Sequence, residues 1–215
     1  MNREVLCLYA ITDRSYLSGR ALSLEEAVGE ALKGGVTIVQ LREKLLDEGD
    51  LRSEALLLQR LCARFHVPLI LDDNVRLAVE LGCDGVHVGQ SDMPAGEARR
   101  MIGPGKILGV TAKTVEQAKA AEAAGADYLG SGAMFITSTK PEALPMSGEL
   151  LRAIAGSVDI PVAAIGGIDI TNASQLEGCG IAGIAVSGGI FGKPDIRQAA
   201  LMLREEAERI TGLHG

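Results

Sequence analysis

The sequence contains no tryptophan, only 3% aromatic residues, and no long apolar run without charges. A membrane helix needs about 18 consecutive apolar residues, and the longest uncharged stretch, residues 178–192, is rich in glycine. The first residues lack the apolar segment of a signal peptide. We therefore expect a cytoplasmic protein with no membrane partner and a mainly aliphatic core.

Cysteine is also scarce, with four residues that are far apart and form no C-x-x-C pair. This spacing argues against a disulfide framework and against a zinc site. We expect the cysteines to be small buried hydrophobic residues in a reducing compartment.

The sequence has more acidic than basic residues, with a net charge of −7. This argues against a nucleic acid or an anionic membrane as the main partner. A phosphorylated small molecule is still compatible, since a local cluster of lysine and arginine can oppose the overall sign. No linker-like segment divides the chain, so we expect one domain over residues 1–215. A homo-oligomer is compatible with the sequence.

Short β-branched apolar runs alternate with amphipathic helical patterns along the chain. The candidate strands are residues 6–12, 38–41, 68–71, 85–88, 107–110, 128–131, 161–165 and 183–186. Capping boxes over residues 23–26, from Ser23 to Glu26, and over residues 114–117, from Thr114 to Gln117, mark the starts of two helices. Eight strand–helix units in 215 residues predict a single (β/α)8 TIM barrel. A doubly wound open sheet is the alternative.

Polar residues follow the predicted strands at their carboxyl ends, where a parallel barrel carries its active site. Gln40, Arg42 and Lys44 alternate after the second strand and would share one face. A guanidinium, an ammonium and an amide together suit a phosphate or diphosphate. A strand that runs out into a solvated turn would give the same pattern. Polar residues at so many consecutive strand ends favour a built site.

Two carboxylates follow adjacent predicted strands. Asp73 and Asp92 supply the hard oxygen ligands that Mg²⁺ prefers, together with phosphate oxygens and water. The alternative is that Asp73 caps the helix beginning near Val75 and that Asp92 caps the helix after Pro94.

Glycines follow the last two predicted strands, at Gly166-Gly167 and Ser187-Gly188-Gly189. A barrel commonly binds phosphate there through backbone N–H groups, although tight turns would also explain these glycines. Residues 188–193 resemble a P-loop, but the spacing between the glycines is one residue too short. Pro194 also stands where a P-loop needs Ser or Thr, so we exclude a P-loop.

Lys140 and His87 are further candidates. Lys140 follows the sixth strand and has three candidate roles: a Schiff-base nucleophile, a phosphate clamp or a solvated lysine. The sequence shows no sign of the desolvated pocket that a low-pKa lysine needs, which favours the clamp over the nucleophile. His87 alternates with Val86 and Val88, which favours a hydrogen-bonded barrel-interior residue over a general base.

Taken in order, these segments resemble the thiamine phosphate synthase family over nearly the whole chain. The carrying segments are residues 9–13, 40–44, 85–92, 109–111, 137–140 and 165–168. That family uses a (β/α)8 barrel to join hydroxymethylpyrimidine diphosphate to thiazole phosphate, with release of diphosphate. The resemblance implies a Mg²⁺-dependent transferase of thiamine biosynthesis with two small phosphorylated substrates. In such a reaction diphosphate can leave before the thiazole nitrogen attacks, and no protein nucleophile is required.

The resemblance also implies roles for individual residues. Those that would hold the pyrimidine diphosphate are Gln40, Arg42, Lys44, Asp72, Thr111 and Lys140. Among them, Arg42, Lys44 and Lys140 would be catalytic. Those that would hold the thiazole phosphate are Thr137, Ser138, Thr139, Gly167, Val186 and Ser187. Asp73 and Asp92 would bind Mg²⁺.

Two positions depart from the family pattern. Asp72 stands where the family usually has asparagine, so it can accept but not donate a hydrogen bond. Thr111 stands where serine is common, which keeps the hydroxyl.

Three other functions remain as alternatives. A related thiazole tautomerase barrel would lack the acidic metal pair and the diphosphate chemistry. A non-catalytic barrel that binds thiamine precursors would need similar residues. A Schiff-base aldolase would use Lys140 as its nucleophile.

Overall fold

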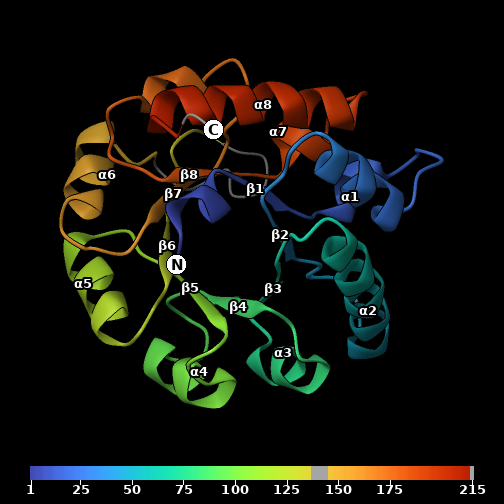
Figure 1. Ribbon diagram of the computed structural model, residues 1–215, viewed down its shortest axis with the longest axis horizontal. Coiled ribbons are helices and arrows are strands. Elements are labelled where there is room, and N and C mark those ends of the chain that lie inside the picture. Colours follow the sequence, from blue (N-terminus) through green and yellow to red (C-terminus); the bar gives the residue numbers. More distant parts are fainter. Residues whose placement is uncertain (137–144, 214–215) are drawn as a thin grey trace.

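Eight parallel strands form a closed barrel in which each strand pairs with the next and β8 pairs with β1 (Figure 1). The computed structural model describes residues 1–136 and 145–213. The strands are β1 (Leu8–Ile11), β2 (Ile38–Leu41), β3 (Leu69–Asp72), β4 (Gly85–Val88), β5 (Ile107–Thr111), β6 (Tyr128–Gly132), β7 (Val162–Ile165) and β8 (Gly183–Val186). The (β/α)8 TIM barrel prediction is confirmed, and the open-sheet alternative is wrong.

Helices surround the barrel on its outer side (Figure 1). They are η1 (Arg3–Leu6), η2 (Arg14–Leu17), α1 (Leu24–Lys33), α2 (Glu48–Arg64), α3 (Val75–Leu81), α4 (Ala95–Ile102), α5 (Val115–Ala123), α6 (Gly148–Ala155), η3 (Ala173–Leu176), α7 (Gly188–Phe191) and α8 (Ile196–Thr211). Within the described ranges, none of these helices is both long and apolar enough to cross a membrane.

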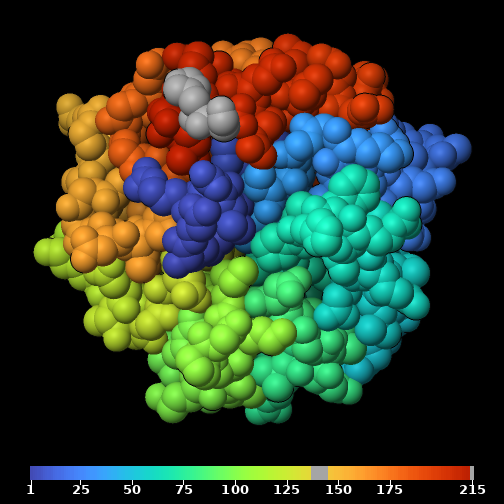
Figure 2. Space-filling model, viewed as in Figure 1, coloured from blue at the N-terminus to red at the C-terminus, as the bar shows by residue number. Residues whose placement is uncertain are grey.

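The amino end of the barrel is covered by the first residues of the chain. The strand predicted over residues 6–12 is wrong at its start, because Leu6 ends the 3-10 helix η1. Leu6 is fully buried in the apolar cluster inside the barrel. The N-terminal segment accordingly lies over the centre of the molecule in Figure 2. Here the apolar residue serves as a plug for the barrel and not as part of a strand.

Two of the predicted helix starts differ in their caps. At α1, Ser23 Oγ accepts from Glu26 N and Ser23 N donates to Glu26 Oε2, so this capping box is confirmed. At α5, Thr114 accepts from Gln117 N. A capping box also needs the Gln117 side chain to accept from the N–H of Thr114. It accepts instead from the N–H of Lys113, one residue earlier, so the prediction of a complete capping box is wrong at this helix.

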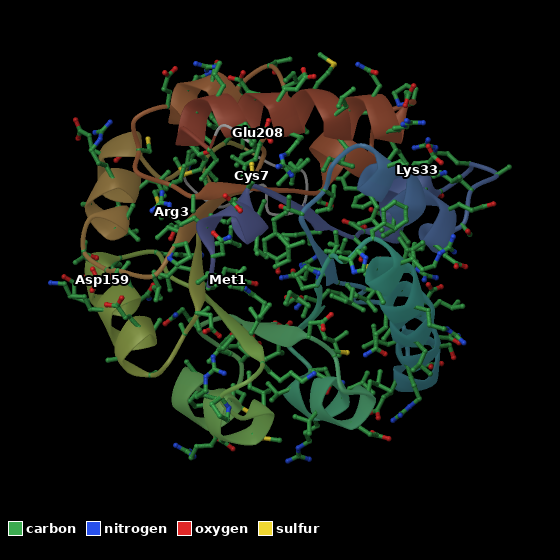
Figure 3. The ribbon with its side chains drawn as sticks, viewed as in Figure 1. Met1, Arg3, Cys7, Lys33, Asp159 and Glu208 are labelled. Atoms are coloured by element: carbon green, nitrogen blue, oxygen red, sulfur yellow. The ribbon has the colours of Figure 1, made fainter. Side chains whose placement is uncertain are left out.

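All four cysteines are free and buried, as their spacing predicts. Cys7 lies beneath α8, whose Glu208 is nearby in Figure 3. Burial raises the pKa of the Cys7 thiol to about 11 and that of Cys62 to about 12. These thiols are therefore protonated and unreactive at neutral pH.

The barrel interior contains a chain of hydrogen bonds among polar side chains. Gln40 Nε2 donates to Tyr9 Oη at 2.7 Å, and the hydroxyls of Tyr9 and Tyr128 lie 2.7 Å apart. His87 Nδ1 lies 3.1 Å from Tyr128 Oη, and His87 Nε2 lies 2.9 Å from Thr111 Oγ1. The expected interior role of His87 is confirmed by these partners.

Burial lowers the pKa of His87 to about 4. In the unfolded chain His87 takes up a proton near pH 6.5, whereas the folded protein keeps it neutral until about pH 4. Acidification through this range favours the unfolded state by about 1.4 kcal/mol per pH unit. The contribution of neutral His87 to the free energy of unfolding is therefore fully present above pH 6.5 and decreases as the pH falls from 6.5 towards 4.

We expect the substitution His87→Gln to remove this dependence. The difference in unfolding free energy between wild type and His87→Gln should shrink by about 2 kcal/mol when the pH falls from about 7.5 to about 5. Urea unfolding of both proteins at the two pH values measures this change. Because the remaining titratable groups are the same in both proteins, a constant difference in unfolding free energy would contradict a neutral buried His87.

Candidate active site

A pocket of about 820 Å³ opens at the carboxyl ends of the strands. Residues from all eight strands or the loops that follow them line it. A volume of this size suits one or two small molecules. Most of the described polar residues predicted at the strand ends, from Gln40 to Ser187, therefore face a common space.

The basic residues after β2 line this pocket together with carboxylates from β3. Arg42 Nε lies 3.5 Å and Lys44 Nζ 3.6 Å from Asp72 Oδ2, and Lys44 also pairs with Asp73. Gln40 is only 3% exposed and Arg42 is half-buried. The structure thus places Arg42 and Lys44 against acidic partners at the pocket wall, although Lys44 lies in the turn after β2 with its side chain 52% exposed.

Asp73 is not the helix cap that one reading of the sequence predicts. The N-cap of α3 is Asn74, whose Oδ1 accepts from Leu77 N at 3.0 Å. Asp73 has a φ of 58°, a left-handed conformation that is uncommon outside glycine. The carboxylate of Asp73 points to Lys44 instead. Strained backbone of this kind is often found at functional sites.

Asp92 is not a helix cap either. The N-cap position of α4 is Pro94, which makes no side-chain capping bond. Asp92 Oδ2 instead accepts from Gly89 N at 2.7 Å within the loop after β4. A Cβ at Gly89 would lie 2.8 Å from that oxygen, so a side chain at this position would displace the Asp92 carboxylate.

The carboxylates after β3 and β4 interact electrostatically. Burial, together with the neighbouring charges of Asp73 and Asp92, raises the pKa of Asp72 to about 6, although Lys44 and Arg42 act to lower it. Among the described residues, no group of three or more His, Cys, Asp or Glu side chains is arranged to hold a metal ion. Asp73 and Asp92 supply two carboxylates, which fits Mg²⁺, because that ion commonly takes one or two carboxylates with phosphate oxygens and water.

The interior chain of hydrogen bonds ends at two pocket residues, Gln40 and Thr111. One Gln40 amide N–H is used on Tyr9, which leaves the carbonyl oxygen and the second N–H for a ligand. The hydroxyls of Tyr9 and Tyr128 share a hydrogen bond, and Tyr128 Oη shares another with His87 Nδ1. His87 Nε2 and Thr111 Oγ1 lie 2.9 Å apart, and in the tautomer that carries the proton on Nε2 the Thr111 hydroxyl is left to donate to a ligand.

The opposite wall of the pocket is rich in glycine. Gly166 and Gly167 follow β7 with φ of 99° and 66°, so the turn reading accounts for their backbone, and both line the pocket. Val186 and Ser187 line it as well. Ser187 Oγ is buried and, among the described residues, has no hydrogen-bond partner. A buried hydroxyl in this state is suited to a ligand oxygen.

Four predicted residues lie outside the described residues: Thr137, Ser138, Thr139 and Lys140.

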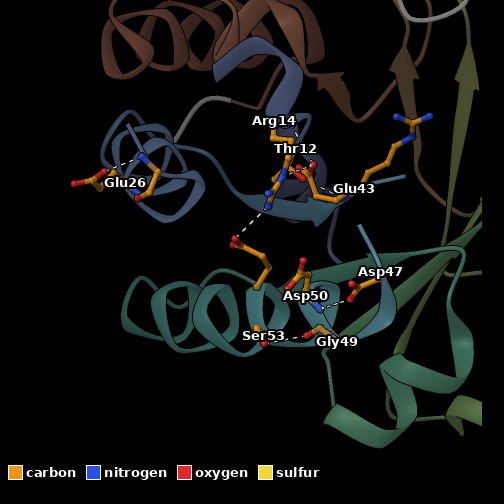
Figure 4. A network of polar contacts seen from close by, with 11 residues as sticks. Thr12, Arg14, Glu26, Glu43, Asp47, Gly49, Asp50 and Ser53 are labelled. Carbon is orange, nitrogen blue, oxygen red and sulfur yellow. Dashed lines mark hydrogen bonds and ion pairs between the residues drawn. The ribbon is translucent and has the colours of Figure 1, made fainter. Parts of the chain in front are cut away.

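The loop after β1 also contributes to the pocket, through Asp13 and Tyr16. Figure 4 shows how this loop is attached. Arg14 N and Nε donate to Glu43 Oε2 at 3.3 and 3.2 Å, and Arg14 Nη2 donates to Glu54 Oε1 at 3.1 Å. Burial raises the pKa of Glu43. This half-buried network fixes the loop to β2 and α2.

Sequence reasoning missed several residues of the pocket. Tyr9 lines its floor, and the pair Asp169 and Lys193 lines the wall after β7 and β8, with Nζ 3.2 Å from Oδ2. A signal for Lys193 was present, because it ends the glycine-containing segment that resembles a P-loop. Asp169 follows the Gly166-Gly167 pair closely, but nothing in the sequence pairs it with Lys193.

Comparisons with known proteins agree with this geometry. The family model for thiamine monophosphate synthase matches residues 8–190. A thiamine-phosphate synthase of Ruminiclostridium cellulolyticum is 48% identical over 198 residues, covering 92% of this chain and 93% of the relative. One from Methanobrevibacter smithii is 46% identical over 191 residues, covering 89% and 90%.

A solved structure supports the same assignment. The thiamine phosphate pyrophosphorylase of Pyrococcus furiosus superimposes with a TM-score of 0.88 and is 38% identical, covering 97% of this chain and 98% of that one. Similarity of sequence and of fold thus extends over nearly the whole chain. On these grounds, the chain belongs to the thiamine monophosphate synthase family.

Proposed function

We propose that this protein is a transferase that makes thiamine phosphate. It transfers the hydroxymethylpyrimidine group from its diphosphate to thiazole phosphate and releases diphosphate. The observation that carries the proposal is the cluster of Arg42 and Lys44 against Asp72 and Asp73, within one pocket that also contains Asp92. The relatives named thiamine-phosphate synthase support it.

The cations of the cluster would act on the leaving group. Arg42 and Lys44 would contact the diphosphate, with Lys140 completing the clamp, and would stabilise the negative charge that develops as it leaves. Mg²⁺ bound by Asp73 and Asp92 would supply additional positive charge to the diphosphate oxygens. No protein nucleophile is required, because the thiazole nitrogen attacks the pyrimidine methylene.

The interior chain of hydrogen bonds would orient the pyrimidine substrate. Gln40 would accept from the pyrimidine amine through its carbonyl oxygen, and Thr111 would donate to the diphosphate. Asp72 would accept from the same amine. Its oxygen already faces Arg42 and Lys44, so at this position a carboxylate can be tolerated in place of the family's asparagine.

The glycine-rich wall would hold the thiazole phosphate. Gly167, Val186 and Ser187 supply backbone close to the pocket and a buried hydroxyl without a hydrogen-bond partner in the described part of the chain. Residues 137–139 would complete this subsite. The substrates are thus two small phosphorylated molecules. A cytoplasmic location and a homo-oligomer stay predictions, the former in keeping with the four free, buried cysteines.

The direct test is to mix both phosphorylated precursors with the protein, with and without Mg²⁺, and to assay thiamine phosphate. We expect product only when Mg²⁺ is present. Isomerisation of the thiazole phosphate without any thiamine phosphate would instead indicate a tautomerase. Binding of both precursors without conversion would indicate a non-catalytic binding protein.

The substitution Asp92→Asn tests the metal ligand. Asparagine retains an acceptor for Gly89 N, so the loop should remain folded, but the carboxylate charge is lost. We expect kcat to fall by about 100-fold or more, with a partial recovery at high Mg²⁺ and an unchanged Tm. The matched control is Asp195→Asn, at the N-cap of α8, where asparagine caps equally well. Equal activity of Asp92→Asn and wild type would exclude Asp92 as a ligand.

Lys140→Ala distinguishes the clamp from a Schiff-base nucleophile. A clamp predicts a loss of turnover of about 100-fold, because one charge on the leaving diphosphate is removed. It also predicts that borohydride traps no substrate on the wild-type protein. Borohydride-dependent labelling of Lys140, seen by mass spectrometry, would support the aldolase reading instead.

A further inference from the structure

Lys193 is a cation of the pocket that the proposed mechanism does not use. It follows α7, and its Nζ lies 3.2 Å from Asp169 Oδ2 in the loop after β7. Both residues line the pocket, and the Lys193 side chain is 39% exposed. In the barrel, β7 lies four strands from β3, so this pair is on the wall opposite Asp72.

The backbone around this pair is fixed. Arg20, from the loop before α1, donates to the carbonyl oxygens of Phe191 and Lys193 at 3.0 Å each and to that of Pro194 at 3.1 Å. Asp169 Oδ1 accepts from Thr171 N at 2.8 Å and from Thr171 Oγ1 at 2.6 Å. The carboxylate is therefore held in place, and the flexible part of the pair is the lysine side chain.

The surroundings of Lys193 suit a phosphate. Among the described pocket residues supplied by β6, β7, β8 and the loops after them, Lys193 is the single cation. The same wall contains Ser187 Oγ, for which the described chain offers no hydrogen-bond partner. A phosphate dianion placed here without Lys193 would face the Asp169 carboxylate uncompensated, which is unfavourable.

We propose that Lys193 binds the phosphate of the thiazole substrate and that Asp169 holds its ammonium ready for that contact. A lysine has three donors, so Nζ can contact the phosphate and Asp169 together. The inference rests on the proposed function, since it assigns a residue to one of its substrates. It also explains the segment 188–193: its lysine serves a phosphate without the backbone geometry of a P-loop.

Lys193→Met tests this role, because methionine retains an apolar stem and loses the charge. The dissociation constants of thiazole phosphate and of its dephosphorylated alcohol are measured by calorimetry on the intact protein. We expect Lys193→Met to weaken binding of thiazole phosphate by about 10- to 100-fold, in line with a hydrogen bond to a charged group. Binding of the alcohol should be unchanged, and Lys193→Arg should restore most of the affinity for the phosphate. The KM for the pyrimidine diphosphate should stay within twofold of wild type.

Two further variants make the result specific. Lys33→Met removes a lysine that pairs with Glu30 at the periphery of the molecule (Figure 3) and should bind like wild type. Asp169→Asn retains an acceptor for Thr171 but loses the oxygen that holds the Lys193 ammonium, and it also removes a negative charge near the phosphate. Because these two effects oppose each other, its affinity for thiazole phosphate should fall clearly less than that of Lys193→Met.

Three results would overturn the proposal. Lys193→Met could bind thiazole phosphate as tightly as wild type, or it could lose as much affinity for the alcohol as for the phosphate. Asp169→Asn could also lose as much affinity for thiazole phosphate as Lys193→Met does. The last two would make the ion pair a purely structural contact. Because binding is measured apart from turnover, a wild-type protein that binds thiazole phosphate through Lys193 without making thiamine phosphate would refute only the proposed function.

Discussion

The pairing of β1 with β8 is the contact on which the site depends, because it closes the sheet into a barrel. Closure brings the carboxyl ends of all eight strands to one rim, so side chains from distant parts of the sequence line a single pocket. It also lets Tyr9 and Tyr128 meet inside the barrel at 2.7 Å, 119 residues apart in sequence. An open sheet would provide neither the common rim nor the buried chain of hydrogen bonds that fixes Gln40 and Thr111.

Charge balance explains how a chain with a net charge of −7 can bind polyanionic substrates. Arg42 and Lys44 are held by Asp72 and Asp73, so the cations are positioned without being left unpaired. A diphosphate would share these cations with the carboxylates, and the remaining negative charge calls for a metal ion. On the opposite wall, Lys193 and its carboxylate partner repeat the arrangement on a smaller scale. Each half of the pocket thus combines a cation with a fixed acidic neighbour.

The sequence predicts the barrel well, because the periodicity of strands and helices is local. Seven predicted strands agree with the structure to within one residue at each end, whereas the first fails at Leu6, an apolar residue that plugs the barrel. The roles of adjacent polar residues were harder to predict. The sequence Asp72-Asp73-Asn74 alone does not show that Asn74 caps α3 and that Asp73 faces the pocket. The contact of Tyr128 with Tyr9 depends on closure of the barrel, and the position of Lys193 in the pocket depends on α7. Neither can be read from a local sequence pattern.

The central claim is that the cations after β2 and the carboxylates after β3 and β4 form one site for diphosphate with a divalent metal. Calorimetric titration of the protein with inorganic diphosphate, in Mg²⁺ and in a chelator, tests this claim without catalysis. The account predicts that diphosphate binds at least about tenfold more tightly with Mg²⁺, since two carboxylates in the cluster would otherwise repel it. Equal affinity in Mg²⁺ and in the chelator would contradict it.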